Sequence, residues 1–432
     1  MNILFISNDL IGGNVAYLLK KEGHNVKLFI EDCGRHENFN NMLIKTYNWK
    51  KELSWVGKDG LIVFDDVGYG EIQDDLRKDG YTVFGGTADS DRLEQDRTYG
   101  QKMFKKYGLK TVPFKDFSNV KKAIAYAKKN RRAWVIKQNN HHYSKVLNYV
   151  GEFDDGRDVV GMLKNYYHSK KAGSEKISLH QKIIGVEIGV GRYFNGNDWV
   201  GPIEFNIEYP KFFPGDIGPM TSEMGTLAWY SDDEKNKLYK ETLEKIKPLL
   251  KKIKFKGDFE INCIVNETGA YPLEATPRFG SPIVHLHSDL HMSPWGEFLY
   301  AIAKGEQYNL KWKKGYGLVV LVAVPPFPYV EKAQKNLLYG SYIYFDNLPP
   351  KDMDHIHFEE VSYNQNKKTY YVSDTRGYIL YVTDVKPTIK KVQESVYRMI
   401  KGIYLPKMFY RNDIGDSFAK ENQAKLKKWG YL

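Results

Sequence analysis

Two glutamates in one predicted β-hairpin are the residues of this sequence most able to do chemistry. The stretch from Gly257 to Pro282 alternates apolar and polar residues around a short turn at 266–268, which is the pattern of two antiparallel strands. With a three-residue loop, Glu260 lies directly opposite Glu274, and Thr276 follows on the same face. Two carboxylates at that separation, about 5 Å between Cβ atoms, repel each other unless a cation or a proton lies between them.

The predicted chemistry is therefore the binding of a divalent metal ion. Oxygen ligands of this kind suit Mg²⁺ (or Mn²⁺), which keeps several waters and shares its coordination with nucleotide phosphates. The alternative is an ordinary polar strand edge that faces solvent. The PRFG sequence at 277–280, together with the rest of the chain, favours the metal site.

The composition is that of a folded protein with several domains. The chain has 432 residues, of which 42% are hydrophobic and 14% aromatic, enough for two or three proper cores. Its two cysteines, Cys33 and Cys263, cannot form a disulfide framework and are typical of a reducing cytoplasm. The longest apolar run, at 318–324, is too short to span a bilayer. The first ten residues predict a strand and not a signal peptide.

The net charge is +11, from 64 Lys and Arg against 53 Asp and Glu, and it is not concentrated in one part of the sequence. The lysines are scattered in pairs, as expected of solvated helix faces, whereas a nucleic-acid binder would concentrate them in one stripe or arm. We therefore expect small-molecule substrates, with a phosphorylated substrate as a modest possibility, and no nucleic-acid partner.

The pattern of elements predicts an α/β protein in three units. Residues 1–95 alternate strand and helix, which predicts a Rossmann-like parallel sheet. Gly12-Gly13 after its first strand favours either a phosphate-binding turn or a plain tight turn. A charged helix from Arg92 to Tyr107 leads into a second unit at 96–310, and a β-rich third unit occupies 311–432.

Five segments, in order, resemble one protein family. They are VFGGTADSDRLEQDRTYGQKMFKKYGLKTVPF, WVIKQ, GDIGPMTSEMGTLAWY, LEATPRFGSP and FYRNDIG. Together they resemble the ATP-grasp ligases, and most of all glycinamide ribonucleotide synthetase (phosphoribosylamine–glycine ligase). The resemblance implies that 96–310 is an ATP-grasp domain of two α+β subdomains, with a small lid subdomain at about 112–182. It also implies an ATP-dependent reaction in which a carboxylate becomes an acyl phosphate and is then attacked by an amine.

The same resemblance implies roles for individual residues. Lys137 and Arg97 would reach the nucleotide phosphates, Lys145 would act from the flap over them, the backbone at Lys182 and Ile183 would read adenine, and Glu187 would bind ribose. Metal ligation falls to Glu260, Glu274, Thr276 and Asn262. Arg278 would stabilise the acyl phosphate or hold a carboxylate. The acceptor substrate would meet the segment 218–225 and the residue after the PRFG sequence, with the candidate contacts Pro219, Thr221, Glu223, Gly225 and Ser281.

The sequence departs from the family where substrates are held. The flap reads QNNHHYSKVL, without glycine and with His141 and His142 in place, and the segments NDLIGGNVA and RFGSPI have lost family residues. The sequence therefore predicts a ligase whose carboxylate and amine substrates differ from those of the family. Two alternatives stay open: a genuine phosphoribosylamine–glycine ligase, and a catalytically silent nucleotide-binding regulatory protein. The sequence does not decide between a monomer and a homodimer.

Overall fold

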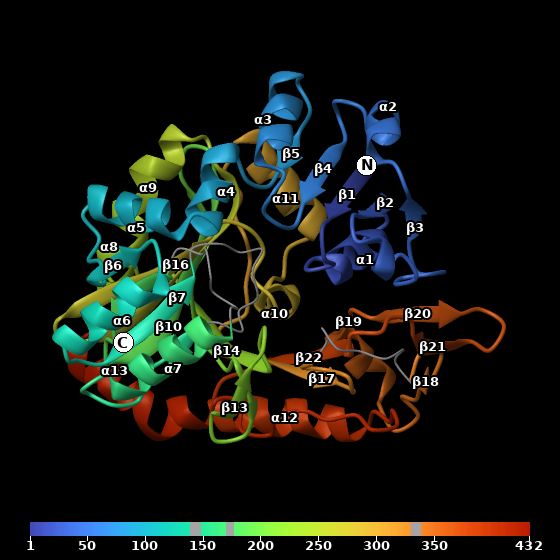
Figure 1. Ribbon diagram of the computed structural model, residues 1–432. Helices are drawn as coiled ribbons and strands as arrows, with labels where there is room; N and C mark the ends of the chain where they lie inside the picture. Colours follow the sequence, from blue (N-terminus) through green and yellow to red (C-terminus); the bar gives the residue numbers. More distant parts are fainter. Residues whose placement is uncertain (139–147, 170–176, 330–337) are drawn as a thin grey trace.

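The computed structural model describes residues 1–138, 148–169, 177–329 and 338–432, and it confirms the mixed α/β fold class (Figure 1). A parallel sheet, a small antiparallel sheet and a large antiparallel sheet follow one another along the chain. No helix within these ranges is long and apolar enough to cross a membrane.

The N-terminal part is a five-stranded parallel sheet in the order β3-β2-β1-β4-β5. The residues from Ile3 to Ile6 on the central strand are fully buried, as the apolar run in that strand predicts. The strands are β1 (Asn2–Ser7), β2 (Asn25–Ile30), β3 (Ile44–Thr46), β4 (Leu61–Phe64) and β5 (Val83–Phe84). The helices are α1 (Gly13–Lys21), α2 (Leu53–Val56), α3 (Gly70–Lys78) and α4 (Ala88–Gln95).

The single helix predicted from Arg92 to Tyr107 is wrong, because the chain forms two helices there. Asp96 separates α4 from α5 (Arg97–Lys106) with φ −112° and ψ 88°, outside the helical region. Its carboxylate accepts a hydrogen bond from the Tyr99 N–H at 3.0 Å, which caps α5. The break makes Arg97 the first residue of α5.

A small sheet with its own core follows. Its four antiparallel strands lie in the order β6-β9-β7-β8, and side chains such as Trp134, Ile136 and Leu163 form a cluster separate from the main core. The strands are β6 (Phe114–Phe117), β7 (Trp134–Gln138), β8 (Tyr149–Val150) and β9 (Ile177–Gln181), with helices α6 (Val120–Lys129) and α7 (Arg157–His168). This is the segment predicted as the lid.

The large sheet has eight strands in the order β16-β15-β10-β11-β14-β17-β22-β19. Its strands are β10 (Val186–Asn195), β11 (Trp199–Glu208), β14 (Gly225–Ser231), β15 (Lys256–Asn266), β16 (Gly269–Thr276), β17 (Tyr316–Ala323), β19 (Ile356–Phe358) and β22 (Tyr378–Lys386). Because β14 pairs with β17, the sheet runs across the boundary predicted at 310. The C-terminal strands thus continue the central sheet.

The remaining elements cover this sheet or extend from it. They are the hairpin β12 (Lys211–Phe213) and β13 (Ile217–Met220), the three-stranded sheet β18 (Tyr342–Ile343), β20 (Val361–Asn364) and β21 (Thr369–Val372), and the helices α8 (Lys237–Glu241), α9 (Leu243–Lys252), α10 (Ile283–Leu290), α11 (Trp295–Lys304), α12 (Ile389–Lys401) and α13 (Gln423–Trp429). In Figure 1 the three-stranded sheet lies below the N-terminal sheet, and the Phe39 N–H donates to the Val361 carbonyl at 3.0 Å between them.

A buried arginine joins the N-terminal part of the chain to residues 359–374. Arg35 is 2% exposed, and its guanidinium lies 3.0 Å from carboxylate oxygens of Asp9, Glu359 and Asp374 and 3.3 Å from Glu360. Removing one partner of such a cluster leaves buried charge without compensation.

We therefore expect Arg35→Met to lower the free energy of unfolding by about 3–5 kcal/mol, measured by urea denaturation. Arg131→Met is the matched control, because the Arg131–Asp155 pair at 2.9 Å is largely exposed and contributes little. Equal midpoints for the two variants would contradict the prediction.

Candidate active site

The hairpin of β15 and β16 forms as predicted, but its register differs. Its turn has two residues, at 267–268, and a bulge interrupts the pairing after Asn262. Glu260 therefore pairs with Thr276, and Glu274 pairs with Asn262. The predicted direct opposition of Glu260 and Glu274 is wrong. The pairing is shifted by two residues, so the glutamates stay on one face as diagonal neighbours.

These four residues belong to a larger group of acidic side chains on one face of the large sheet. Asn262 Nδ2 donates to Glu187 Oε1 at 3.0 Å and to Glu208 Oε2 at 3.1 Å. Glu208 in turn is hydrogen-bonded to Glu223, which also accepts a bond from the Thr226 hydroxyl. Neighbouring strands therefore bring carboxylates from β10, β11 and the loop before β14 to the two metal-ligand candidates of the hairpin.

The crowding of acidic groups raises their pKa values. Burial, and then the charge of Glu204, raises the pKa of Glu260 to about 8. Burial raises the pKa of Glu208, and Glu223 and Glu260 raise it further. The cause is the desolvation and mutual repulsion of like charges. A bound cation would relieve both.

The residues present fit a divalent cation without forming a finished site. Within the described ranges, no three His, Cys, Asp or Glu side chains are arranged to hold a metal ion. Yet Asn262 is 6% exposed and its Oδ1 has no partner among the described residues. A free buried oxygen beside several carboxylates matches the oxygen ligands that hard cations prefer. Substrate phosphates would have to complete the coordination.

Two cations face this carboxylate group from other elements. Lys137, on β7 of the small sheet, is close enough to Glu274 and Glu187 for their charges to raise its pKa. Arg97, at the start of α5, donates from Nη2 to Glu274 Oε2 at 3.0 Å. Burial, and then the charge of Arg97, lowers the pKa of Lys137 to about 8. The predicted phosphate-binding pair thus lies where the small and large sheets meet.

The segment between β9 and β10 connects the small sheet to the large sheet, as predicted. It is the segment to which the sequence assigns the adenine contacts. The Lys182 N–H already donates to the Ala133 carbonyl at 3.0 Å, and its Nζ donates to the Gly151 carbonyl at 2.7 Å. No described residue bonds to the N–H or C=O of Ile183. Glu187, five residues after Lys182, is exposed at the start of β10. Ile183 is therefore the better placed of the two to read a base edge.

Arg278 is paired with carboxylates of the N-terminal part of the chain, and it is also close enough to Glu274 for that charge to act on it. Its Nη2 donates to Glu94 Oε1 at 3.0 Å, its Nη1 donates to the Phe279 carbonyl at 2.8 Å, and its Nε lies 3.7 Å from Asp66 Oδ1. These carboxylates raise the pKa of Arg278 against the effect of burial. Ser281, three residues on, is hydrogen-bonded to Tyr381 of β22. A substrate carboxylate bound at Nη2 of Arg278 would compete with Glu94, whereas Nε has no hydrogen-bond partner among the described residues.

The predicted acceptor segment forms the hairpin arm β13 and the turn into β14. Pro219 lies on β13, the Thr221 N–H and hydroxyl donate to the Pro210 carbonyl, and Gly225 has φ +158° close to the Val319 carbonyl. Glu223 is 7% exposed and is bonded within the protein.

The FYRNDIG segment explains how this hairpin is held in place. Arg411, fully buried, donates to Asp216 Oδ1 at 2.8 Å and to the Lys211 carbonyl at 2.9 Å. Asp413 accepts from the Gly215 N–H at 2.8 Å and from Arg411. The motif therefore positions the acceptor segment from the C-terminal end of the chain.

Lys145, His141 and His142 lie outside the described residues. Three other residues were missed from the sequence. Glu208 ends a strand and was not singled out, and the buried His180 has an unpartnered Nε2 and a pKa lowered to about 3 by burial, Lys137 and Arg97. Glu94, the partner of Arg278, lies on α4. The alternation of β9 places His180 on the same face as Ser178, which pairs with Lys137, and this was the available signal.

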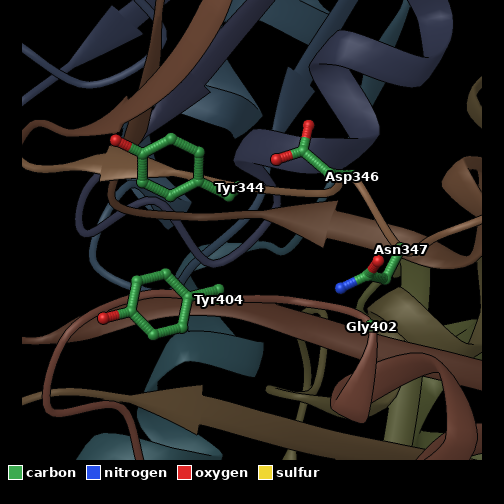
Figure 2. Close-up of a pocket in the computed structure, with 5 residues that line it drawn as sticks. All are labelled: Tyr344, Asp346, Asn347, Gly402 and Tyr404. Carbon is green, nitrogen blue, oxygen red and sulfur yellow. The ribbon is translucent and has the colours of Figure 1, made fainter.

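A surface pocket lies elsewhere in the molecule. It has a volume of about 370 Å³ and is lined by Tyr344, Asp346, Asn347, Gly402 and Tyr404 (Figure 2). The two tyrosine rings lie side by side, 6.0 Å apart. All five residues come from the C-terminal part of the chain, so the pocket is separate from the carboxylate face.

A family comparison agrees with this geometry. Residues 95–284 match the profile of the phosphoribosylglycinamide synthetase ATP-grasp (A) domain. The small sheet, the segment between β9 and β10, and the carboxylate face of the large sheet all lie within the matched range.

Relatives extend the likeness beyond the ATP-grasp domain. A phosphoribosylamine–glycine ligase from Fusobacterium nucleatum is 24% identical over 384 residues, covering 86% of this chain and 85% of the relative. A solved structure of phosphoribosylamine–glycine ligase from Thermotoga maritima has a TM-score of 0.69 at 20% identity, over 96% of this chain and 100% of that one. The solved structure of N5-carboxyaminoimidazole synthetase from Staphylococcus aureus has a TM-score of 0.56 at 14% identity, over 93% of this chain and 97% of that one.

The resemblance drawn from the sequence is confirmed: the chain is similar to the phosphoribosylamine–glycine ligases over most of its length, and residues 95–284 match an ATP-grasp domain. The solved structures, at this level of identity, show the shared fold.

Proposed function

We propose that this protein is an ADP-forming ligase that uses ATP and Mg²⁺ to join a carboxylate to an amine through an acyl phosphate. One observation carries the proposal. Lys137 and Arg97 meet the carboxylate-rich face of the large sheet, where Glu187, Glu274 and Asn262 lie together. Paired cations facing oxygen ligands are the means by which proteins hold and transfer a phosphoryl group.

Each residue has a part in this reaction. Lys137 and Arg97 neutralise the nucleotide phosphates, and Glu187 at the edge of the site accepts ribose hydroxyls. Glu260, Glu274 and Asn262 would hold the metal ion, which neutralises the charge on the phosphates when bound. Thr276, paired with Glu260, is the fourth member of this set.

The substrate pair is proposed to differ from glycine and phosphoribosylamine. The segment after Arg278 carries Ser281 and the buried Ile283 and is less acidic than that of the family, and Glu223 adds a carboxylate to the acceptor segment. An amino-acid-like carboxylate would be held by Arg278 after release from Glu94. An amine would approach from the side of Glu223.

A genuine phosphoribosylamine–glycine ligase is the second candidate. The observation in its favour is that relatives bearing that name align over most of both chains. Formation of glycinamide ribonucleotide by the purified protein, or rescue of a purine auxotroph lacking that ligase, would establish it and reject the changed substrate pair.

The first test is ligand-dependent stability. Mg²⁺–ATP at millimolar concentration is expected to raise the melting temperature, because a ligand that binds only the folded state stabilises it. ADP release is then screened across carboxylates and amines. An unchanged melting temperature would rule out the nucleotide site. Stabilisation with no carboxylate-dependent ADP release would instead favour the silent regulatory protein.

A further inference from the structure

The turn between β1 and α1 has the form of an anion site. The chain leaves β1 for α1 and the outer strands β2 and β3, and returns on the other side of β1 as β4. Ligands of open parallel sheets bind at such a reversal of strand order. α1 begins at Gly13 with no side-chain cap, and free N–H groups at a helix N-terminus attract anions.

An aspartate of this chain already occupies that anion position. Asp65, directly after β4, is fully buried. Its Oδ2 accepts hydrogen bonds from the Gly12 N–H and from the Ser7 hydroxyl, both at 2.7 Å. The Ser7 oxygen in turn accepts from the Leu10 N–H at 2.7 Å. The donors of the turn therefore face a carboxyl group from within the protein.

The turn is also closely packed. A Cβ added at Gly12 would lie 2.7 Å from the Phe5 ring and 3.0 Å from the Asp65 Cβ, and one at Gly13 would lie 2.8 Å from Phe39. Of the two interpretations of Gly12-Gly13, the tight turn is the one that this packing supports.

The surrounding loops add further carboxylates. Asp9, Asp32 and Asp66 follow β1, β2 and β4. Arg376 bonds to Asp9 at 2.6 Å and to Asp32, and Arg278 lies 3.7 Å from Asp66. A phosphate entering here would have to displace a carboxylate from each arginine, and it would be repelled by the carboxylates themselves.

We propose that Asp65 is a specificity-determining residue that takes the place of a ligand phosphate and restricts the acceptor at this edge to an unphosphorylated amine. The inference rests on the proposed ligase function, which it narrows to one class of acceptor. The carboxylates around the turn attract the ammonium group of such an acceptor and repel a sugar phosphate.

The test is the binding of ribose 5-phosphate, measured by calorimetry with Mg²⁺–ADP already saturating the nucleotide site. The wild type is expected to show no binding at millimolar ligand. Asp65→Ser removes the carboxylate and opens space beside the Gly12 N–H, and we expect its affinity to rise by at least about tenfold. Asp66→Ser is the matched control, because it removes a neighbouring charge but leaves the turn filled.

Asp65→Asn keeps the shape of the side chain, so its affinity for ribose 5-phosphate should rise less. If Asp65→Ser does not fold, Asp65→Asn is compared with Asp66→Ser in its place. Submillimolar binding by the wild type, or equal affinities in the Asp65 and Asp66 variants, would overturn the inference. The measurement needs no turnover. A failure of ADP release would therefore reject the ligase function separately.

Discussion

Replacing Lys137 with methionine is expected to slow ADP release by about 10²–10³-fold. Methionine keeps the aliphatic stem but removes a positive charge that the small sheet places against Glu274 and Glu187. Because that charge is desolvated, it interacts strongly with a transferred phosphoryl group. We expect most of the loss in kcat and a milder change in nucleotide binding, measured by steady-state kinetics and by titration with ADP.

Lys115→Met is the matched control for this variant. Lys115 pairs with Leu179 whereas Lys137 pairs with Ser178, so the two lysines project from opposite faces of the same sheet. Its removal should leave kcat unchanged. Normal turnover of Lys137→Met would show that the phosphates bind elsewhere.

Local patterns predicted many of the elements, among them the hairpin that carries the candidate metal ligands. The alternation around β15 and β16 predicts their hairpin, and Phe259, Ile261 and Cys263 are indeed fully buried. The register was missed for two reasons: the turn has two residues where three were predicted, and the bulge after Asn262 shifts the pairing by one more. The bulge also changes which residues of β16 are buried, from Ala270 and Pro272 before it to Ala275 after it. As a result the two glutamates were expected directly opposite each other and are instead diagonal.

Contacts between distant segments could not be predicted in the same way. Arg278 was expected to be available for a carboxylate, but Glu94 and Asp66 lie 184 and 212 positions earlier in the chain, and Glu94 lies 3.0 Å away in space. Likewise the Gly12-Gly13 pair was ambiguous, because the residue that fills the turn comes from another strand. A one-dimensional pattern shows which residues share a face, and tertiary packing decides what faces them.

Glu274→Ala is expected to lower turnover by at least about 100-fold while changing the free energy of unfolding by less than about 1 kcal/mol. The Glu274 side chain is 47% exposed and forms an ion pair with Arg97 at 3.0 Å, and a pair with so exposed a carboxylate contributes little to folding. Its proposed role is to share a metal ion with Glu260 and Asn262. The measurements are ADP release over a range of Mg²⁺ concentrations and urea denaturation, with Glu267→Ala in the hairpin turn as the control.

The ion pair with Arg97 offers a second explanation that the experiment must separate, because Glu274 could act only by holding Arg97. In that case the double variant Arg97→Met/Glu274→Ala would be no slower than Arg97→Met alone. If Glu274 binds the metal, the double variant is slower than either single one, and only variants lacking Glu274 need more Mg²⁺ for half-maximal rate. An unchanged Mg²⁺ requirement in Glu274→Ala would remove this residue from the metal site.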